Sequence, residues 1–328
     1  MSEFRQDPTN GEWVIIAPSR GERPRTRMPA DAKLHRVTFD PNCPFCPGNE
    51  GQLPAIIDEL SSPDYPGWRT RVIPNKFPVL STDREPPSDR ATSGYGNHEV
   101  IIETPRHDID LADMPAEDLE AVVKTWHRRF DAALAMPGIE AVMLFRNRGN
   151  RAGASLGHSH SQLVALPFVP PRLRSALDWA HTHFQSSGKC VICEEIEREL
   201  EDGKRVVECT ELYAVLTPFA AQFPFEQWIV PRRHTPSFIM ANTKEQAALG
   251  HALKNALERL RSAKGDVSYN LVLEPGSPGD VLASAAHWSM RVVPHLTTPG
   301  GFELGTGMII NPSSPERDSR WWHRRENY

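Results

Sequence analysis

The chain has no apolar run that approaches the ~18 residues of a membrane-spanning helix. Its first eight residues have no apolar core of the kind that secretory signal peptides carry. Positive charge is also not in excess: the net charge is −5 and the isoelectric point about 6.2, which argues against a general nucleic-acid-binding surface. The 328 residues are 39% hydrophobic, enough for one large domain or two ordinary ones. We therefore expect a cytoplasmic protein with a substantial core.

Cysteine is scarce, but four of the five cysteines form two C-x-x-C pairs. The pairs are Cys43 with Cys46 and Cys190 with Cys193. In a reducing cytosol such pairs indicate a metal site or a redox site rather than a structural disulfide. A Pro-Gly-Asn turn at residues 47–49 follows the first pair, whereas a redox cysteine prefers a helix N-terminus. We favour zinc for both pairs and expect Cys209 to be an ordinary small side chain.

The two halves of the chain repeat one order of features. Each half contains a C-x-x-C pair, a predicted strand, a helix, a second strand, a turn with glycine, and a histidine. The predicted strands are residues 99–103 and 141–145 in the first half, and 227–230 and 269–273 in the second. His158 follows His107 by 51 residues, and His287 follows His234 by 53. We therefore predict two similar units, residues 1–175 and 176–328.

Both predicted helices have apolar side chains at helical spacing. The stripe of the helix at 115–136 is Leu119, Val122, Val123, Trp126, Phe130 and Leu134, and that of the second helix is Leu249, Leu253, Leu257 and Leu260. Thr243-x-x-Gln246 has the pattern of a capping box at the start of the second helix. Each unit is thus predicted to be an α+β unit whose helix covers one face of a sheet.

The repeat assigns two metal sites. The first set is Cys43, Cys46, His107 and His158, and the second is Cys190, Cys193, His234 and His287. Four nitrogen and sulfur ligands leave no open coordination position, which is typical of structural zinc. His98 is an alternative to His107 as the third ligand. The repeat favours His107, because His234 also follows its strand shortly after a proline.

The segment from His158 to Gln162, with sequence His-Ser-His-Ser-Gln, carries the strongest chemical signal. In a strand, the side chains of His158, His160 and Gln162 would leave the same face. An imidazole is a nucleophile near neutral pH, and phosphorus is a natural target for it. The turn-rich residues 148–157 just upstream contain glycines that allow backbone N–H groups to approach a phosphate.

The second half lacks this candidate nucleophile. When the repeats are aligned on His158 and His287, His160 falls on Ser289 and Gln162 on Arg291. A pure scaffold gives no reason for the free imidazole of His160. The asymmetry therefore predicts a single active site, in the first half.

These motifs resemble the galactose-1-phosphate uridylyltransferase family of the histidine-triad superfamily, in which a His-x-His-x-Gln segment holds the nucleophile. The resemblance extends over nearly the whole chain, from residues 7–13 to 301–307. It implies a homodimer and a fold of two tandem histidine-triad-like α+β halves that share one mainly antiparallel sheet, with helices on one side. The implied activity is nucleotidyl transfer between a nucleoside-diphosphate sugar and a sugar 1-phosphate through a covalent nucleotidyl-histidine.

The resemblance also implies roles for particular residues. The family's motif places the nucleophile on His160 and a phosphate-binding amide on Gln162, and its zinc ligands match the first metal set. The family's other nucleotide- and phosphate-binding positions match Arg20, Arg23, Asn75, Lys76, Phe77, Asn147, Gly153 and Ser155.

Two departures from the family pattern bear on the substrate. A His-x-His second metal site of some members is replaced here by Arg291-Val292-Val293, and the second C-x-x-C pair resembles a branch with two zincs. A Tyr-Glu pair that binds galactose in some members corresponds to Thr306-Gly307. The two-zinc branch includes plant ADP-glucose phosphorylase as well as uridylyltransferases.

Three functions follow from these patterns. We expect a UDP-glucose–hexose-1-phosphate uridylyltransferase of galactose metabolism. The alternatives are an ADP-glucose phosphorylase-type adenylyltransferase and, from a different class, a non-catalytic zinc-built nucleotide-binding module.

Overall fold

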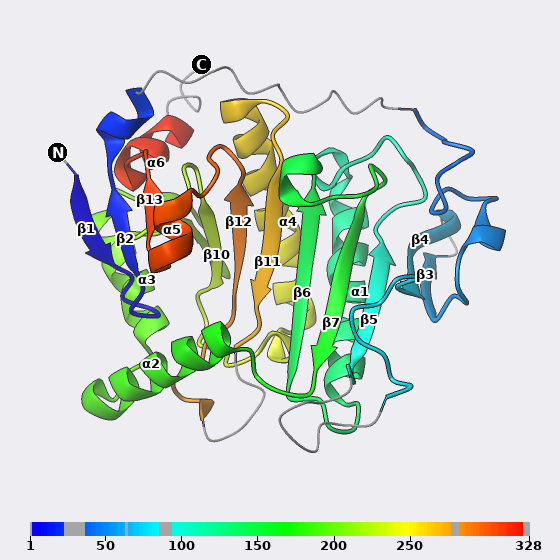
Figure 1. The fold of residues 1–328 in the computed structure, drawn as a ribbon, viewed down its shortest axis with the longest axis horizontal. Coiled ribbons are helices and arrows are strands. Elements are labelled where there is room, and N and C mark those ends of the chain that lie inside the picture. Colours follow the sequence, from blue (N-terminus) through cyan, green and yellow to red (C-terminus); the bar gives the residue numbers. More distant parts are fainter. Residues whose placement is uncertain (1, 23–36, 63–64, 85–93, 277–281, 324–328) are drawn as a thin grey trace.

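A computed structural model describes residues 2–22, 37–62, 65–84, 94–276 and 282–323 (Figure 1). Within these ranges, ten strands form one sheet in the order β3-β4-β5-β7-β6-β11-β12-β10-β9-β8, and every neighbouring pair is antiparallel. The strands are β3 Asp58–Ser62, β4 Tyr65–Pro74, β5 Asn97–Ile102, β6 Ala141–Arg148, β7 His160–Leu166, β8 Val206–Cys209, β9 Tyr213–Leu216, β10 Gln227–Pro231, β11 Tyr269–Glu274 and β12 Ser289–Pro294. The predicted mainly antiparallel sheet is confirmed.

A smaller sheet lies beside the second half of the large one (Figure 1). It contains β1 Glu3–Gln6, β2 Trp13–Ile16 and β13 Ile309–Asn311. Strand β2 pairs antiparallel with β1 and parallel with β13, so the first and last parts of the described chain meet there.

The helices are α1 Ala116–Leu134, α2 Pro171–Ser187, α3 Val191–Asp202, α4 Thr243–Lys264, α5 Gly301–Thr306 and α6 Pro315–His323. Short 3-10 turns are η1 Pro18–Glu22, η2 Glu50–Gln52, η3 Leu111–Asp113, η4 Asn150–Ala152 and η5 Phe238–Met240. No helix in the described part of the chain has the length and apolar character that would be needed to cross a bilayer.

The main core lies between the large sheet and the helices α1 and α4, which cover one face (Figure 1). Leu119 and Trp126 of α1 and Leu249 and Leu253 of α4 join one apolar cluster with the strands, and each is at most 1% exposed. Full burial of such a side chain stabilises the fold by roughly 1.5–3 kcal/mol. The predicted apolar stripes therefore do face the core.

Two details differ from the sequence-based expectations. The capping box of α4 begins one residue earlier than predicted: Asn242 accepts from the backbone N–H of Glu245, and the Glu245 carboxylate accepts from the N–H of Asn242. Thr243 has helical geometry instead, because Asn is at least as good an N-cap as Thr. In addition, α2 lies over the opposite face of the sheet from α1 and α4, where its Leu173 lines a cavity with Val272 of β11.

The two halves of the chain meet at the pairing of β6 with β11, where Asn147 lies opposite Asn270. On one side of this junction the strands come from the first half, and on the other side from the second. The boundary at residue 175 falls inside α2, and the division of the chain into units 1–175 and 176–328 stays a prediction.

Candidate active site and metal centres

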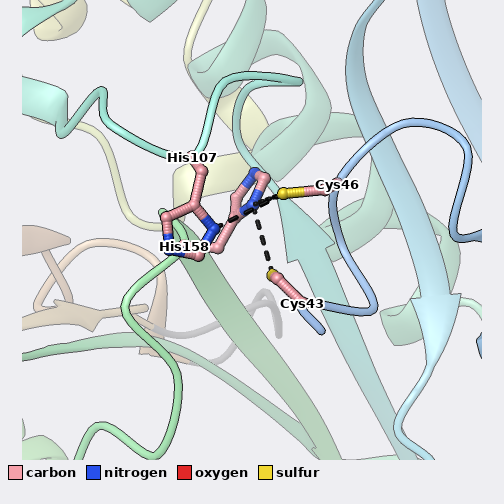
Figure 2. A group of neighbouring side chains, drawn as sticks. All are labelled: Cys43, Cys46, His107 and His158. Carbon is pink, nitrogen blue, oxygen red and sulfur yellow. Dashed lines mark hydrogen bonds between the residues drawn. The ribbon is translucent and has the colours of Figure 1, made fainter. Parts of the chain in front are cut away.

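The first predicted metal set converges beside the start of β7. Figure 2 shows Cys43 and Cys46 facing His107 and His158. The His158 Nδ1 atom lies 3.6 Å from the Cys43 sulfur and 3.7 Å from the Cys46 sulfur, and His107 Nδ1 lies 3.5 Å from the Cys46 sulfur. A tetrahedral zinc ion, with Zn–S near 2.3 Å and Zn–N near 2.0 Å, separates its sulfur and nitrogen ligands by about 3.5 Å. The four side chains therefore fit a tetrahedral metal ion.

A hydrogen bond to the backbone fixes the orientation of the His158 ring. Its Nε2–H donates to the carbonyl of Thr104 at 2.8 Å, which leaves the lone pair of Nδ1 for the ligand group. Burial lowers the pKa of His158 to about 4, so the ring is neutral near pH 7, as a metal ligand must be. His98, the alternative third ligand, lies elsewhere, because its Nε2 is 2.9 Å from the side-chain oxygen of Gln162.

The second predicted set converges in the same way. Cys193 lies 3.5 Å from His234 Nδ1 and 3.4 Å from His287 Nδ1, and Cys190 lies 3.9 Å from His287 Nδ1. The outer nitrogens of His234 and His287 donate to the carbonyls of Ala283 and Pro231. Although Cys190 is the N-cap of α3, a setting that suits redox cysteines, the two imidazoles make this a second group that could hold a metal ion.

His160 is the first residue of β7 and is 7% exposed. Its Nδ1–H donates to the carbonyl of His158 at 2.7 Å, so the neutral ring keeps the lone pair on Nε2. Burial lowers the pKa of His160, against the effect of that hydrogen bond, and so favours the neutral form. The ring of Phe45 packs edge-on against it at 5.4 Å between centroids. His160 is thus a neutral imidazole held in one orientation.

A cavity lies beside His160 at the end of β6. It is lined by His107, Asp110, Arg146, Asn147, Arg148, Ser155, Ser159 and His160, among others. Gly149 and Gly153, with φ of +82° and +85°, form the turn that bounds it. At Gly149 a Cβ would lie 2.2 Å from the Ser268 hydroxyl, so only glycine fits there. Of the predicted phosphate-binding positions, Asn147 and Ser155 line this cavity, and Gly153 lies beside Asn147.

Gln162 lies two residues further along β7, and a residue that the sequence-based reasoning did not assign to it sets its orientation. The backbone N–H of Val79 donates to Nδ1 of His98, so the His98 Nε2–H donates to the Gln162 side-chain oxygen. The amide nitrogen of Gln162 is therefore the end left to donate to a ligand. Asn75 also contacts His98 Nε2, at 3.1 Å, which brings the predicted Asn75-Lys76-Phe77 segment to the same part of the sheet.

Arg20 and Arg23 are not brought to this cavity. Arg20 is exposed in η1, which follows β2 of the small sheet, beside the second half of the large sheet (Figure 1). Arg23 lies outside the described residues. Phe77 is 82% exposed, with its ring free of the core.

Three of the cavity's lining residues, Asp110, Arg146 and Ser159, belong to a buried charge network that the sequence did not reveal. Arg146 donates to Glu103 at 2.9 Å, to Asp110 at 2.6 Å and to the Ser159 hydroxyl at 2.9 Å. Ser159 in turn donates to Glu103 at 2.7 Å. The network fixes the residue between the metal ligand and His160. Its members are far apart in the chain, so no local sequence signal could have identified it.

In the second half, the position equivalent to Gln162 has different chemistry. Arg291 forms ion pairs with Glu226 and with Glu274, and the Ser289 hydroxyl donates to Glu274 at 3.0 Å. The Glu226 side chain is 1% exposed and that of Arg291 is 12% exposed. These bonds use three of the five N–H groups of Arg291, so the second half has an ion pair where the first half has an imidazole and an amide.

The geometry agrees with the comparisons to known proteins. The family model described as "Galactose-1-phosphate uridyl transferase, N-terminal domain" matches residues 1–170. The chain belongs to this family. An ADP-glucose phosphorylase from Arabidopsis thaliana is 35% identical over 96% of this chain and 90% of its own length. A galactose-1-phosphate uridylyltransferase from Thermotoga maritima is 28% identical over 98% of this chain and 97% of its own length.

A solved structure gives the same result. The crystal structure of an ADP-glucose phosphorylase from Arabidopsis thaliana with bound ADP-glucose matches with a TM-score of 0.87 and 34% identity, covering 99% of this chain and 98% of that one. Membership of the galactose-1-phosphate uridylyltransferase family makes the chain a nucleotidyltransferase. Family membership therefore favours an enzyme over the non-catalytic nucleotide-binding module.

Proposed function

We propose that this chain transfers a nucleotidyl group from a nucleoside-diphosphate sugar to a phosphate acceptor through a covalent bond to His160. Nε2 of His160 attacks the α-phosphorus, and the bond from that phosphorus to the bridging oxygen breaks, which releases the sugar 1-phosphate. An oxygen of the acceptor phosphate then attacks the nucleotidyl-histidine and frees His160. Division of one displacement into two gives ping-pong kinetics.

The observation that carries this proposal is the orientation of His160. Because Nδ1–H is committed to the carbonyl of His158, the nucleophilic lone pair is on Nε2. The ring lines the cavity at the glycine-bearing turn, where a phosphate could sit. Donors from Gln162, Asn147, Ser155 and the turn would stabilise charge on the transferring group, the effect that dominates phosphoryl transfer.

We propose that both metal groups hold structural zinc. Two thiolates and two imidazoles are the donor set that zinc prefers, and with four protein ligands no coordination position remains for a substrate. In the first group the ion would hold His158 in place, two residues from the nucleophile. These zinc ions would hold the segments that carry their ligands in place, and His160 would carry out the nucleophilic attack.

The donor that we favour is ADP-glucose, with inorganic phosphate as acceptor. This reverses the order of the sequence-based expectation, which placed UDP-glucose first and ADP-glucose second. It is supported by the greater identity to the phosphorylase than to the Thermotoga uridylyltransferase. The end of α5 adds a physical reason. The Thr306 hydroxyl donates to the Phe302 carbonyl at 2.7 Å and accepts from the Met308 N–H at 3.1 Å. Because the Thr306 hydroxyl already makes these two hydrogen bonds within α5 and the turn after it, it is a poor substitute for the Tyr-Glu pair that binds galactose in some members of the family.

UDP-glucose with galactose 1-phosphate is the second candidate, because several relatives are named galactose-1-phosphate uridylyltransferase. The two are separated by incubation of the protein with each donor and each acceptor, and measurement of released glucose 1-phosphate. We expect kcat/KM to be at least about tenfold higher for ADP-glucose with phosphate, a difference of about 1.4 kcal/mol. Higher kcat/KM for UDP-glucose would select the uridylyltransferase. A homodimer and a cytoplasmic location stay predictions.

A further inference from the structure

Asn270 lies on β11 of the second half, opposite Asn147 on β6 of the first. Its amide nitrogen lies 2.8 Å from the side-chain oxygen of Asn147 and 3.0 Å from the carbonyl of Ala152, in the turn beside His160. Its amide oxygen lies 2.5 Å from Nε2 of His295, which follows β12. One side chain therefore joins the second half to the phosphate-binding turn of the first.

The chemistry of these contacts fixes the orientation of each group in turn. The carbonyl of Ala152 can only accept, so the Asn270 nitrogen must face the turn. The carbonyl of Arg146, at 3.4 Å, is a further acceptor for this amide nitrogen. Asn147 lies closer, at 2.8 Å, and a group that close to a nitrogen that can only donate must be an acceptor, which places the Asn147 oxygen toward Asn270. The Asn147 amide nitrogen is left pointing toward Gly153, where it lies 3.7 Å from the position of a Cβ. On the other side, the Asn270 oxygen requires a proton on Nε2 of His295.

The same arrangement occurs at Gln162. There the Nε2–H of His98 holds the amide oxygen, and the amide nitrogen is left to donate. In both Asn147 and Gln162, the side-chain oxygen thus accepts a hydrogen bond from within the protein, and the amide nitrogen is left for a ligand. An anionic substrate is repelled by an amide oxygen and attracted by an amide N–H. The difference is that His98 belongs to the first half, whereas Asn270 and His295 belong to the half without a nucleophile.

We infer that Asn270 and His295 are positioning residues for nucleotidyl transfer: they lock the Asn147 amide with its N–H groups toward the phosphate. The inference rests on the proposed function, since it assigns Asn147 a phosphate contact. It also gives the second half a role in the reaction, beyond its metal group and its strands.

The test uses the full chain and donors labelled at the α-phosphate, ADP-glucose and UDP-glucose, with the rate of label transfer to the protein measured in a single turnover. Asn270→Asp keeps the size of the side chain but replaces its two donor hydrogens by a second acceptor. The Asn147 amide should then rotate and present its oxygen to the substrate. We expect the rate to fall by about 100-fold, as for loss of one oriented donor. His295→Leu should slow transfer by about tenfold, and His295→Gln, which keeps an N–H donor, by less.

Two controls separate positioning from general damage. Asn255→Asp makes the same change on α4, where the amide donates to Glu208 at 3.0 Å, and should cost stability without slowing label transfer. In an Asn147→Ala background, Asn270→Asp should have no further effect on the rate, because the group it orients is gone. A structural defect would slow the double variant further, and that result would overturn the inference.

The remaining outcomes are also distinct. If Asn270→Asp and His295→Leu transfer label at the wild-type rate while His160→Ala does not, positioning by the second half is wrong and the proposed function stands. If the wild-type protein takes label from neither donor, the proposed function itself fails. Should Asn270→Asp not fold, the comparison of His295→Leu with His295→Gln still decides the question.

Discussion

Gln162 on β7 and Arg291 on β12 occupy equivalent places in the two halves, but one is a neutral amide and the other is a charged guanidinium. Gln162 lies opposite Val100, and Arg291 lies opposite Trp228. His98, two residues before Val100, hydrogen-bonds to Gln162. Glu226, two residues before Trp228, forms an ion pair with Arg291. The neutral pair leaves an amide N–H for a ligand, whereas the ion pair holds the guanidinium between two carboxylates.

The comparison shows which parts of the repeat are structural. Both halves keep two cysteines, two histidines and the backbone carbonyls that orient the histidines. The halves differ at the residues that follow the second histidine, His160 in one and Ser289 in the other. We therefore propose that the metal group of the second half has a structural role, with no reacting group beside it. In the proposed function, activity depends on the imidazole, the amide and the glycine-bearing turn of the first half.

The largest expected effect comes from removal of the imidazole. His160→Ala should lower kcat by about 10⁴-fold or more, because the covalent intermediate cannot form. Ser289→Ala, the matched change in the second half, should leave kcat within about twofold of wild type. Release of glucose 1-phosphate measures both variants, and thermal unfolding confirms that both are folded. Substantial turnover by His160→Ala would reject the assignment of the nucleophile.

The metal groups should separate chemistry from stability. We expect two zinc ions per chain by elemental analysis, and one in either Cys43→Ser or Cys190→Ser. Cys43→Ser should lower kcat by roughly 10–100-fold. The metal that Cys43 helps to bind would also hold His158, which is two residues from His160. Cys190→Ser should lower the melting temperature while kcat stays within about threefold.

Removal of metal from the wild-type protein by a chelator provides a check on this pair. Both kcat and the melting temperature should fall together, since both sites empty. Equal loss of kcat in Cys43→Ser and Cys190→Ser would contradict the division of roles between the halves.

The buried ion pair of the second half gives the next largest effect. Arg291→Gln introduces the residue of the first half but leaves the carboxylate of Glu226, 1% exposed, with backbone N–H donors and without the guanidinium that balances its charge. We expect the free energy of unfolding to fall by about 3–5 kcal/mol, with kcat nearly unchanged. Gln162→Ala should do the reverse, with a cost near 1 kcal/mol in stability and a larger loss of rate. Denaturant titration and steady-state kinetics measure the two quantities.

The double variant Arg291→Gln with Glu226→Gln tests the cause. A neutral amide at residue 226 removes the isolated charge, so part of the lost stability should return. If the double variant is less stable than Arg291→Gln alone, packing and not charge sets the cost.

Much of this comparison was predictable from the sequence, and particular residues show where prediction ended. The two C-x-x-C pairs and the apolar stripes of α1 and α4 follow from spacing alone, because helical period and C-x-x-C chemistry are local. The choice between His107 and His98 needed the repeat, and the structure places His107 in the metal group. His98 was then revealed as the partner of Gln162, a contact between residues 64 positions apart.

The rest could not be predicted because it depends on strand order. Asn270 meets Asn147 only since β11 is hydrogen-bonded to β6 across the junction of the halves. The Arg146 network likewise needs Glu103 from the end of β5 and Asp110 from the loop before α1. The cap of α4 at Asn242 was missed by one residue, since Asn242 and Thr243 both suit an N-cap and only backbone geometry separates them.

The smallest expected effect concerns acid, and here two carboxyls from the two halves respond in opposite directions. Burial alone would raise the pKa of Asp110, but Arg146 and Arg148 outweigh it and hold that pKa at about 2, below its ordinary value of 3.8. A depressed carboxyl stabilises the fold above pH ~4 and loses that contribution as the pH falls toward 2. Burial raises the pKa of Asp318 to about 6, so its contribution is present below pH ~4 and is lost as the pH rises through 6.

Substitution by asparagine should therefore change the pH profile of stability in opposite senses. Between pH 7 and pH 5 the wild-type protein should gain stability relative to Asp318→Asn, by about 1–3 kcal/mol. Between pH 5 and pH 3 it should lose stability relative to Asp110→Asn, by up to about 2 kcal/mol, because Asp110 takes up a proton in the unfolded chain while its pairing with Arg146 and Arg148 keeps it ionised in the folded chain. Urea titrations at each pH measure both differences. Parallel profiles for the wild-type protein and Asp110→Asn down to pH 3 would mean that Arg146 and Arg148 do not depend on this carboxylate. The network behind His160 would then be held by Glu103.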